Sequence, residues 1–435
     1  MNIASTGHVH IPEAWQEVTL EHVAVARGGT PFPHRYQGRR SGAYPFYKVS
    51  DMNAPGNGVA MADSANWIEP DVVSELGAKP FPRGTTIFPK VGGALLTNKK
   101  RLLTRDSVVD NNLMGVTVRD PGAVLPEYLY QWLQSIDLRT LANPGPLPSI
   151  NARRLYELQI PIPPLEEQRR ITRVLALAQR AVENEEKTIA ATRELKQAAL
   201  AEVFARGLRH QPPRDTEIGP LPKDWDVRQL HQLAVVKGGK RLPKGQVLVD
   251  NDTGFAYIRV TDFDENTVAI SGLKFVPKHV QPTIARYVIN KDDVYISIAG
   301  TIGMVGMIPA RLDGANLTEN AARIVVTSQD IEPSYLMRFL DSPAAHEQIR
   351  AATLKNAQPK LALTRIEQLV IAVPPTKEEQ REIMRVFDAI DTSLRNHLAH
   401  LEVLRDLFAA LLDKLMTGGI RVDKLDLDTA AIVAA

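Results

Sequence analysis

The sequence predicts an α+β protein: two globular domains of mixed helix and strand, separated by a long antiparallel pair of helices and related as a pseudo-twofold tandem repeat. Three observations lead to this fold class. A proline-led phrase occurs twice, about 212 positions apart; a long amphipathic segment follows each copy; and strand-like segments fill the region before each copy. The 435 residues are enough for two or three domains of ordinary size.

The repeat is clearest where each long helix is expected to begin. Residues 163–168 read Pro-Pro-Leu-Glu-Glu-Gln, and residues 374–380 read Pro-Pro-Thr-Lys-Glu-Glu-Gln, with one residue inserted. A Trp followed thirteen residues later by a glycine pair also recurs, as Trp15 with Gly28-Gly29 and Trp225 with Gly238-Gly239. This period is far longer than the roughly 20 to 50 residues of a solenoid unit. The repeated units are therefore whole domains.

The two long helices carry the strongest periodic pattern. Apolar residues of the second helix recur at alternating steps of four and three, as in the seam of a coiled coil. The series is Ile383, Phe387, Ile390, Leu394, Leu401, Leu404, Phe408, Leu411 and Leu415, with His397 among them. The first helix keeps the same phase more weakly, because Glu185, Thr192 and Lys196 interrupt it. Leu195 and Leu200 lie beside that seam, where we expect them to widen it.

Burial of this seam decides the expected architecture. Each helix could fold back on its own domain, but Ile383 to Leu415 spans about 48 Å at ~1.5 Å per residue, longer than a small domain is wide. Pairing of the two helices is the simpler solution, and the chain must return between them, so the pair should be antiparallel. The expected boundaries are 1–160 for the first domain, 161–209 for the first helix, 210–373 for a linker and the second domain, 374–421 for the second helix and 422–435 for a tail.

Within the two domains, β-branched and aromatic content predicts six strands. They are Tyr44 to Val49, Gly84 to Val91, Met114 to Arg119, Phe255 to Val260, Asp293 to Ala299 and Arg323 to Thr327. Short helices are expected at Pro126 to Leu138 and at Pro333 to Leu340. Each domain is therefore expected to be α+β.

Two unlike domains held at a fixed distance suit DNA, because sites on one face of a duplex recur about every 34 Å. A glycine turn lets backbone amides approach a phosphate, and neighbouring Arg and Lys add charged hydrogen bonds. Solvated loops are the plain alternative for each basic cluster. The candidate DNA-binding residues are Thr30, Arg35, Tyr36, Arg39, Arg40, Lys90, Lys99, Lys100 and Arg101 in the first domain, and Lys237, Lys240, Arg241, Lys244, Lys355 and Lys360 in the second.

The order of Trp, glycine pair, divergent domain, Glu-Glu-Gln phrase and long helix, all repeated, resembles the DNA-specificity subunit of type I restriction-modification systems. The resemblance covers nearly the whole chain. It implies two target recognition domains, each reading one half of an asymmetric bipartite DNA sequence, with the helices fixing the spacer. It also implies double-stranded DNA, two methyltransferase subunits that bind S-adenosylmethionine, and restriction subunits that translocate and cut as partners. The chain itself would hold no cofactor.

Composition and missing motifs narrow the remaining functions. The net charge is +2, there is no cysteine, and no apolar run approaches the ~18 residues of a membrane span, so we expect a cytoplasmic protein without disulfides or a membrane segment. No Asn-Pro-Pro-Tyr-like motif and no phosphate-binding Gly-rich loop of the Walker type is present, and we expect no intrinsic catalysis. A coiled-coil scaffold with two protein-binding heads is the main alternative. A methyltransferase with an unrecognised cofactor site is a weaker one.

Overall fold

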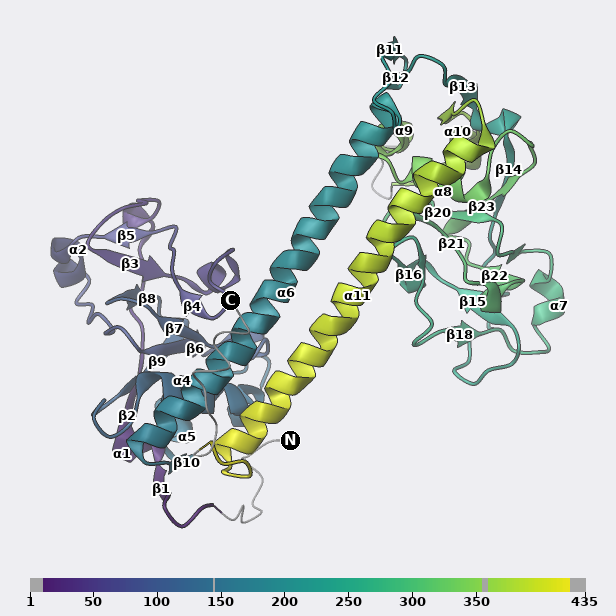
Figure 1. Cartoon of the computed structure of the whole chain (residues 1–435). Coiled ribbons are helices and arrows are strands. Elements are labelled where there is room, and N and C mark those ends of the chain that lie inside the picture. Colours follow the sequence, from purple (N-terminus) through teal and green to yellow (C-terminus); the bar gives the residue numbers. More distant parts are fainter. Residues whose placement is uncertain (1–10, 144, 354–358, 423–435) are drawn as a thin grey trace. The chain divides into compact units, whose positions relative to one another are not determined.

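The computed structural model describes residues 11–143, 145–353 and 359–422. They form two compact units (Figure 1). Unit 1 contains the residues up to Glu186 and those from Ala399 onward, and unit 2 runs from Lys187 to Leu398. We call the globular part of unit 1 head 1 (residues 11–164) and that of unit 2 head 2 (residues 207–376). The predicted tail falls, from residue 423, outside the described residues.

Two long helices each contribute to both units: α6 (Leu165–Arg206) and α11 (Lys377–Met416). Two glutamates stand in the first turn of each helix, where the helix dipole favours negative charge. Directly after α6, Gly207 has φ 66°, and two residues after α11, Gly418 has φ 70°. Both are left-handed conformations that glycine adopts without a steric penalty, and they end the helices.

The halves of α6 and α11 that share a unit run antiparallel, as predicted. In unit 1, Glu167 at the start of α6 pairs at 2.7 Å with Arg421, which follows the end of α11, and Glu186 of α6 pairs with Arg405 of α11 at 2.6 Å. In unit 2, Lys196 of α6 pairs with Asp391 of α11 at 2.8 Å, and Arg209, which follows the end of α6, pairs with Glu382 of α11 at 3.2 Å. Within each unit, a partner later along the α6 segment thus meets a partner earlier along the α11 segment, so the two segments run in opposite directions.

The helix seam packs on the heads as well as on the partner helix. In unit 1, Ile171 and Leu175 share the head 1 core with Leu415 of α11. In unit 2, Leu200 and Phe204 share the head 2 core with Ile383 and Phe387. The alternative of helices folding back on their own domain therefore describes part of the packing.

One detail of the predicted seam is wrong. Leu195 is 59% exposed, whereas Lys196 is only 5% exposed. Lys196 occupies the buried position of the heptad pattern, because Asp391 and the side-chain oxygen of Asn266 bind its ammonium group. The apolar neighbour consequently faces away from the seam.

The described residues of head 1 form ten strands and five short helices. The strands are β1 (Gln16–Thr19), β2 (Ala24–Gly28), β3 (Tyr44–Tyr47), β4 (Ala60–Met61), β5 (Trp67–Ile68), β6 (Thr86–Pro89), β7 (Arg101–Leu103), β8 (Val108–Val109), β9 (Leu113–Val118) and β10 (Gln159–Ile162). The helices are α1 (Leu20–Val23), α2 (Pro70–Glu75), α3 (Gly92–Leu95), α4 (Pro126–Ser135) and α5 (Ala152–Tyr156). Short 3-10 turns lie at His34–Tyr36, Val49–Asn53 and Leu138–Leu141.

In head 2, the part of the chain that the structure describes forms the remaining strands and four helices. The strands are β11 (Pro213–Thr216), β12 (Gly219–Pro222), β13 (Asp226–Gln229), β14 (Ala234–Gly238), β15 (Ala256–Ile258), β16 (Phe263–Asp264), β17 (Thr267–Val268), β18 (Lys274–Phe275), β19 (Val288–Ile289), β20 (Val294–Ser297), β21 (Val305–Met307), β22 (Ala315–Leu317), β23 (Ala321–Val326) and β24 (Val370–Val373). The helices are α7 (Gln281–Ile284), α8 (Pro333–Leu340), α9 (Pro343–Ala352) and α10 (Leu363–Glu367). Its 3-10 turns lie at Leu230–Gln232, Val260–Asp262 and Ala310–Leu312.

The two heads share one strand framework although their sequences diverge. The sheet order β2-β9-β6-β7 of head 1 corresponds to β14-β23-β20-β21 of head 2. Strand β3 pairs with β5 antiparallel and with β8 parallel, and β15 pairs in the same two ways with β18 and β22. The edge pair β1-β10 corresponds to β13-β24. The domain duplication inferred from the sequence is therefore a duplication of topology.

The local predictions fare well. Each of the six predicted strand segments overlaps a strand, and α8 has the predicted limits. Helix α4 ends at Ser135, earlier than predicted, and a 3-10 turn follows at Leu138. Among the described residues, no helix combines the length and the apolar character that crossing a membrane would require.

Candidate nucleic-acid interface

The recurring Trp and Glu-Glu-Gln phrase form one structural tie in each unit. The indole nitrogen of Trp15 donates to Glu167 at 2.9 Å, and that of Trp225 donates to Glu379 at 3.1 Å. Both indoles and both carboxylates are buried. The tie fastens the residue just before β1, or just before β13, to the first turn of the long helix that follows the head.

The Gln of the same phrase clamps a helix of the head. The side chain of Gln168 accepts from the amide of Leu125 at 2.8 Å and donates to the carbonyl of Ala123 at 3.0 Å. Gln380 does the same with Glu332 and Asp330, each at 2.8 Å. These partners precede α4 and α8, so both phrases join head and long helix by the same hydrogen bonds.

The glycine pairs serve strand packing, and the predicted use of their amides for phosphate is wrong. The amide of Gly29 donates to Leu113 and that of Thr30 to Val109; the amides of Gly239 and Lys240 donate to Ala321 and Leu317. A Cβ at Gly29 would lie 2.2 Å from the carbonyl oxygen of Val109, and one at Gly239 would lie 2.0 Å from that of Thr318. Glycine is therefore required for close approach of backbone to backbone.

The basic residues that follow the first glycine pair lie on the surface of head 1. Arg35, Arg39 and Arg40 are exposed, and Thr30 and Tyr36 are half-buried. Arg35 pairs with Glu75 at 2.7 Å and lies over the ring of Tyr36, and Arg39 pairs with Glu69 at 3.7 Å. These ion pairs orient exposed guanidinium groups while leaving donors accessible.

Lys90 is brought close to this region. A Cβ added at Gly28 would lie 2.6 Å from the Lys90 ammonium nitrogen, which therefore sits beside the end of β2. Lys90 is half-buried. It belongs with the glycine-pair region and not with the second basic cluster.

The second basic cluster of head 1 is largely structural. Lys100 is 1% exposed, and its ammonium donates to the carbonyl of Ile136 at 2.6 Å and to the side chain of Asn98 at 2.9 Å. Burial lowers the pKa of Lys100 to about 7. Arg101 donates to the carbonyls of Asn57, Lys100 and Met52, and half-buried Lys99 donates to Asn53. The prediction of DNA contacts is therefore wrong for Lys100 and unsupported for Arg101, because their donors hold the fold.

Head 2 presents an open groove next to its glycine pair. The groove has a volume of about 540 Å³ and is lined by residues from the segment after β14, the turn after β15 and the turn after β22. Its polar and apolar lining includes Arg241, Gln246, Val247, Thr261, Glu319 and Asn320. Val247 is 73% exposed. The groove thus offers hydrogen-bond donors, acceptors and an apolar contact on one accessible surface.

Arg241 is held in position at the edge of this groove. Its Nε pairs with Glu319 at 2.5 Å, and the other carboxylate oxygen of Glu319 accepts from Thr318 at 3.1 Å and from Tyr257 at 3.4 Å. Burial raises the pKa of Tyr257 to about 12, so that hydroxyl stays a donor. Arg241 is exposed, and its pair with Glu319 uses Nε.

The other predicted residues of head 2 are distributed over its surface. Lys237, Lys240, Lys244 and Lys360 are exposed. Lys240 lies over the ring of Tyr287 at 5.7 Å, as does Arg286 at 4.9 Å. Lys355 lies outside the described residues.

The family model for the type I restriction modification DNA specificity domain matches residues 12–192 and again residues 222–403. The chain belongs to this family.

Relatives and solved structures agree with this assignment. The chain is 22% identical to the type I restriction enzyme MjaIX specificity subunit of Methanocaldococcus jannaschii, over 95% of both chains. It is 21% identical to the MjaVIII specificity subunit of the same organism, over 64% of this chain and 66% of that one. In fold it is similar to the S subunit of a type I system from M. genitalium, with a TM-score of 0.54 and 16% identity over 94% of this chain and 96% of that one.

Membership of the specificity family fixes the broad role of this chain. It is a DNA specificity subunit: it serves sequence recognition and is not itself catalytic. Across the ranges that the structure describes, no three His, Asp or Glu side chains gather as a metal site would require. The repeated ties are a feature that the two family domains share.

Sequence reasoning missed several residues of the groove. Glu319 and Asn320 lie in the groove because β22 pairs with β15 in the sheet. No sequence motif predicts that pairing. Thr261 lies in a segment, Ile258 to Asp262, that echoes Tyr47 to Asp51. In both heads the Asp of that segment caps a 3-10 turn, at 2.7 Å for Asp51 and 2.8 Å for Asp262. The similarity of the two segments therefore reflects a shared turn in the fold. Thr261 lies in the groove because it belongs to that turn.

Proposed function

We propose that this chain reads an asymmetric, bipartite DNA sequence, with one head on each half-site and the paired helices α6 and α11 holding the heads at a fixed spacing. The observation that carries the proposal is the pair of heads with one strand framework and different surface residues, each tied to the antiparallel helices by the same hydrogen bonds. Because the two heads share one strand framework, both can dock on duplex DNA in the same way. Because their surface residues differ, each can recognise different bases.

The groove of head 2 has the chemistry that base edges require. In the major groove, Arg pairs with guanine, Asn or Gln pairs with adenine, and apolar side chains contact the thymine methyl group. Arg241, Gln246, Asn320 and Val247 supply each of these groups within one groove. We therefore assign base recognition in head 2 to this groove and phosphate contacts to the surrounding lysines, such as Lys240 and Lys244.

The partners are those that the specificity-subunit family implies. The buried Trp–Glu contact and Gln clamp place each head on its long helix in the same way. This likeness supports docking of two copies of one methyltransferase subunit at two equivalent places. S-adenosylmethionine would be bound by those subunits. Restriction subunits would complete a complex that acts on DNA in the cytoplasm.

The test is to express the chain with its methyltransferase partner and to map modified adenines by single-molecule sequencing. The proposal predicts one motif with two defined parts and a spacer of fixed length. A continuous motif, or no motif with the partner present, would contradict it.

The scaffold alternative makes a different prediction about salt. DNA binding through Lys and Arg should weaken steeply between 50 and 200 mM salt. A scaffold that captures a protein partner through apolar contacts should keep its affinity over that range. Fluorescence anisotropy with labelled duplex, measured on the complex, separates the two.

A further inference from the structure

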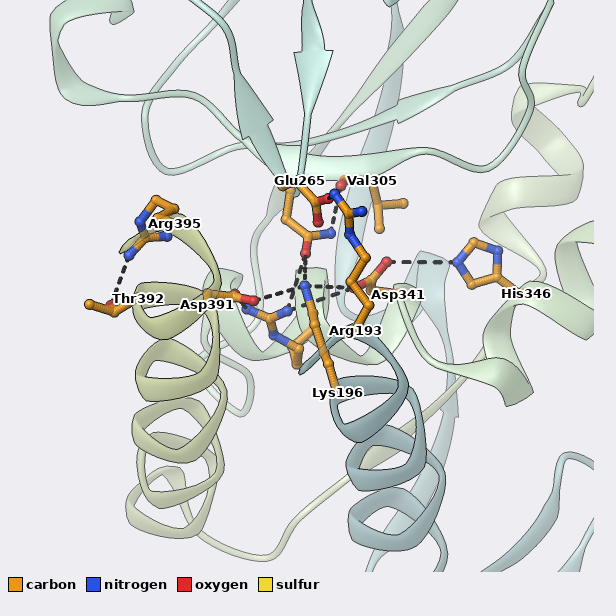
Figure 2. A network of polar contacts seen from close by, with 11 residues as sticks. Arg193, Lys196, Glu265, Val305, Asp341, His346, Asp391, Thr392 and Arg395 are labelled. Carbon is orange, nitrogen blue, oxygen red and sulfur yellow. Dashed lines mark hydrogen bonds and ion pairs between the residues drawn. The ribbon is translucent and has the colours of Figure 1, made fainter. Parts of the chain in front are cut away.

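A cluster of charged residues is buried where α6, α8 and α11 meet in unit 2 (Figure 2). Lys196 of α6, Arg338 of α8 and Asp391 of α11 are 5%, 1% and 8% exposed. The Lys196 ammonium lies 2.8 Å from one oxygen of Asp391, and an Arg338 terminal nitrogen lies 2.5 Å from the other. One carboxylate of α11 is thus shared by a cation from the antiparallel helix and a cation from head 2.

A turn of head 2 closes the cluster. Asn266 has φ 68°, a left-handed conformation that Asn tolerates better than most residues. Its side-chain oxygen accepts from Lys196 at 2.8 Å and from Arg338 at 3.2 Å, and its amide donates to the carbonyl of Val305 at 3.1 Å. On the more exposed rim, the adjacent Glu265 pairs with Arg193 of α6 at 2.9 Å.

Ion pairs join the cations and the carboxylates of the cluster. Two cations, Lys196 and Arg338, face two carboxylates, Asp391 and Asp341, the latter 3.9 Å from Lys196 and 3.7 Å from Arg338. An apolar seam repeats along a helix, so helices can slip by one turn and still bury apolar side chains. A buried charge cannot follow such a slip, because it would leave its partner unpaired in a medium of low polarity.

The corresponding positions of unit 1 carry no charge. The repeat aligns Arg338 with Gln131, Asp391 with Gln179 and Lys196 with Phe408. Phe408 packs, partly buried, against the head 1 core. The cluster is therefore not part of the common framework of the two halves.

We propose that Lys196, Arg338 and Asp391 are positioning residues that lock the axial register of α6, α11 and head 2, and thereby restrict DNA recognition to a single spacer length. The inference rests on the proposed bipartite function. A slip of one helical turn moves a segment by about 5.4 Å, against ~3.4 Å per base pair of DNA. Loss of the lock should therefore admit spacers that differ by one or two base pairs.

The experiment compares the methylated motifs of cells that carry the full complex with variant specificity chains. Lys196→Met with Asp391→Leu removes one cation and one anion and leaves Arg338 with Asp341. The expected result is unchanged half-site bases with additional methylation at spacers one or two base pairs longer or shorter. Arg405→Met with Glu186→Leu is the matched control, because it removes an exposed ion pair between the same helices, 57% and 47% exposed. The control should keep a single spacer.

A second variant keeps the test decisive if the first does not fold. Lys196→Phe, Arg338→Gln and Asp391→Gln together place in unit 2 the residues that unit 1 carries at the corresponding positions, and should relax the spacer in the same way. A folded variant of either kind that methylates only the wild-type spacer would overturn the register lock and leave the bipartite function standing. If the wild-type complex itself gave no bipartite motif, the proposed function would fall and the lock with it.

Discussion

The junctions between the long helices and the heads are built alike in the two units at the start of each long helix and differently further along it. At the helix start, a Trp–Glu contact and a Gln clamp recur with nearly equal distances. Further along, the junction of unit 2 holds Lys196, Arg338 and Asp391 in ion pairs, whereas unit 1 carries Phe408, Gln131 and Gln179 at the corresponding positions. The duplicated chain has kept what fastens a head to a helix, while the buried charges have diverged.

The largest expected effect tests the difference in buried charges between the two units. Arg338→Met takes a cation from the buried Asp391 and the half-buried Asp341 and should cost about 3–5 kcal/mol of stability. Gln131→Met, the matched change in unit 1, should cost less than about 1 kcal/mol, because the Gln131 side-chain oxygen is buried without a hydrogen-bond partner. Hydrogen exchange in α8 and α4 reports the two junctions separately. Equal losses at both would contradict the comparison.

A second prediction concerns a feature that the heads share. Gly239→Ala forces a Cβ against the carbonyl oxygens of Thr318 and Leu317, at 2.0 and 2.4 Å, and should cost about 3 kcal/mol. Gly238→Ala is the control, because its Cβ would meet Leu363 at an ordinary 3.5 Å. Urea unfolding measures both. A mild effect of Gly239→Ala would restore the interpretation of the glycine pair as a flexible phosphate loop.

The pH dependence of head 1 should reveal Lys100. Burial lowers its pKa to about 7, so above neutral pH the unfolded chain binds a proton that the folded chain has released. Stability therefore rises with pH between the folded and unfolded pKa values, by about 2 kcal/mol from pH 7 to pH 9. Lys100→Met should lack this rise. Unfolding of both chains across that range, read from hydrogen exchange in α4, checks it, and parallel pH profiles would count against a buried, weakly protonated Lys100.

The smallest expected effect on the fold is the most specific for function. Arg241→Ala removes an exposed side chain from the head 2 groove and should leave thermal unfolding unchanged. It should relax one base position in one half-site, because a guanidinium held by Glu319 no longer reads a base edge. Lys244→Ala, if it meets phosphate, should weaken binding to all sequences alike. Sequencing of methylated sites distinguishes the two, and an unchanged motif in Arg241→Ala would remove Arg241 from base recognition.

Sequence reasoning reached the duplication, the antiparallel helices and the limits of α8, because these depend on periodicity and on local residue preferences. It failed where tertiary contacts decide the role of a residue. Lys100 and Arg101 look like a basic DNA-binding patch in sequence, yet their donors are used by carbonyl groups of the fold. Lys196 looks like an interruption of the seam, yet partners on α11 and in head 2 bury it there. The sequence pattern of the helix alone does not predict those partners.

The most direct test of the central claim is to exchange one head. Residues 1–160 would be replaced by the corresponding segment of another specificity subunit, and the methylated sites would be sequenced in cells that carry the complete complex. Two heads that read independently on a shared helix pair predict that one half of the motif changes while the other half and the spacer stay the same. A change in both halves, or in neither, would contradict the account.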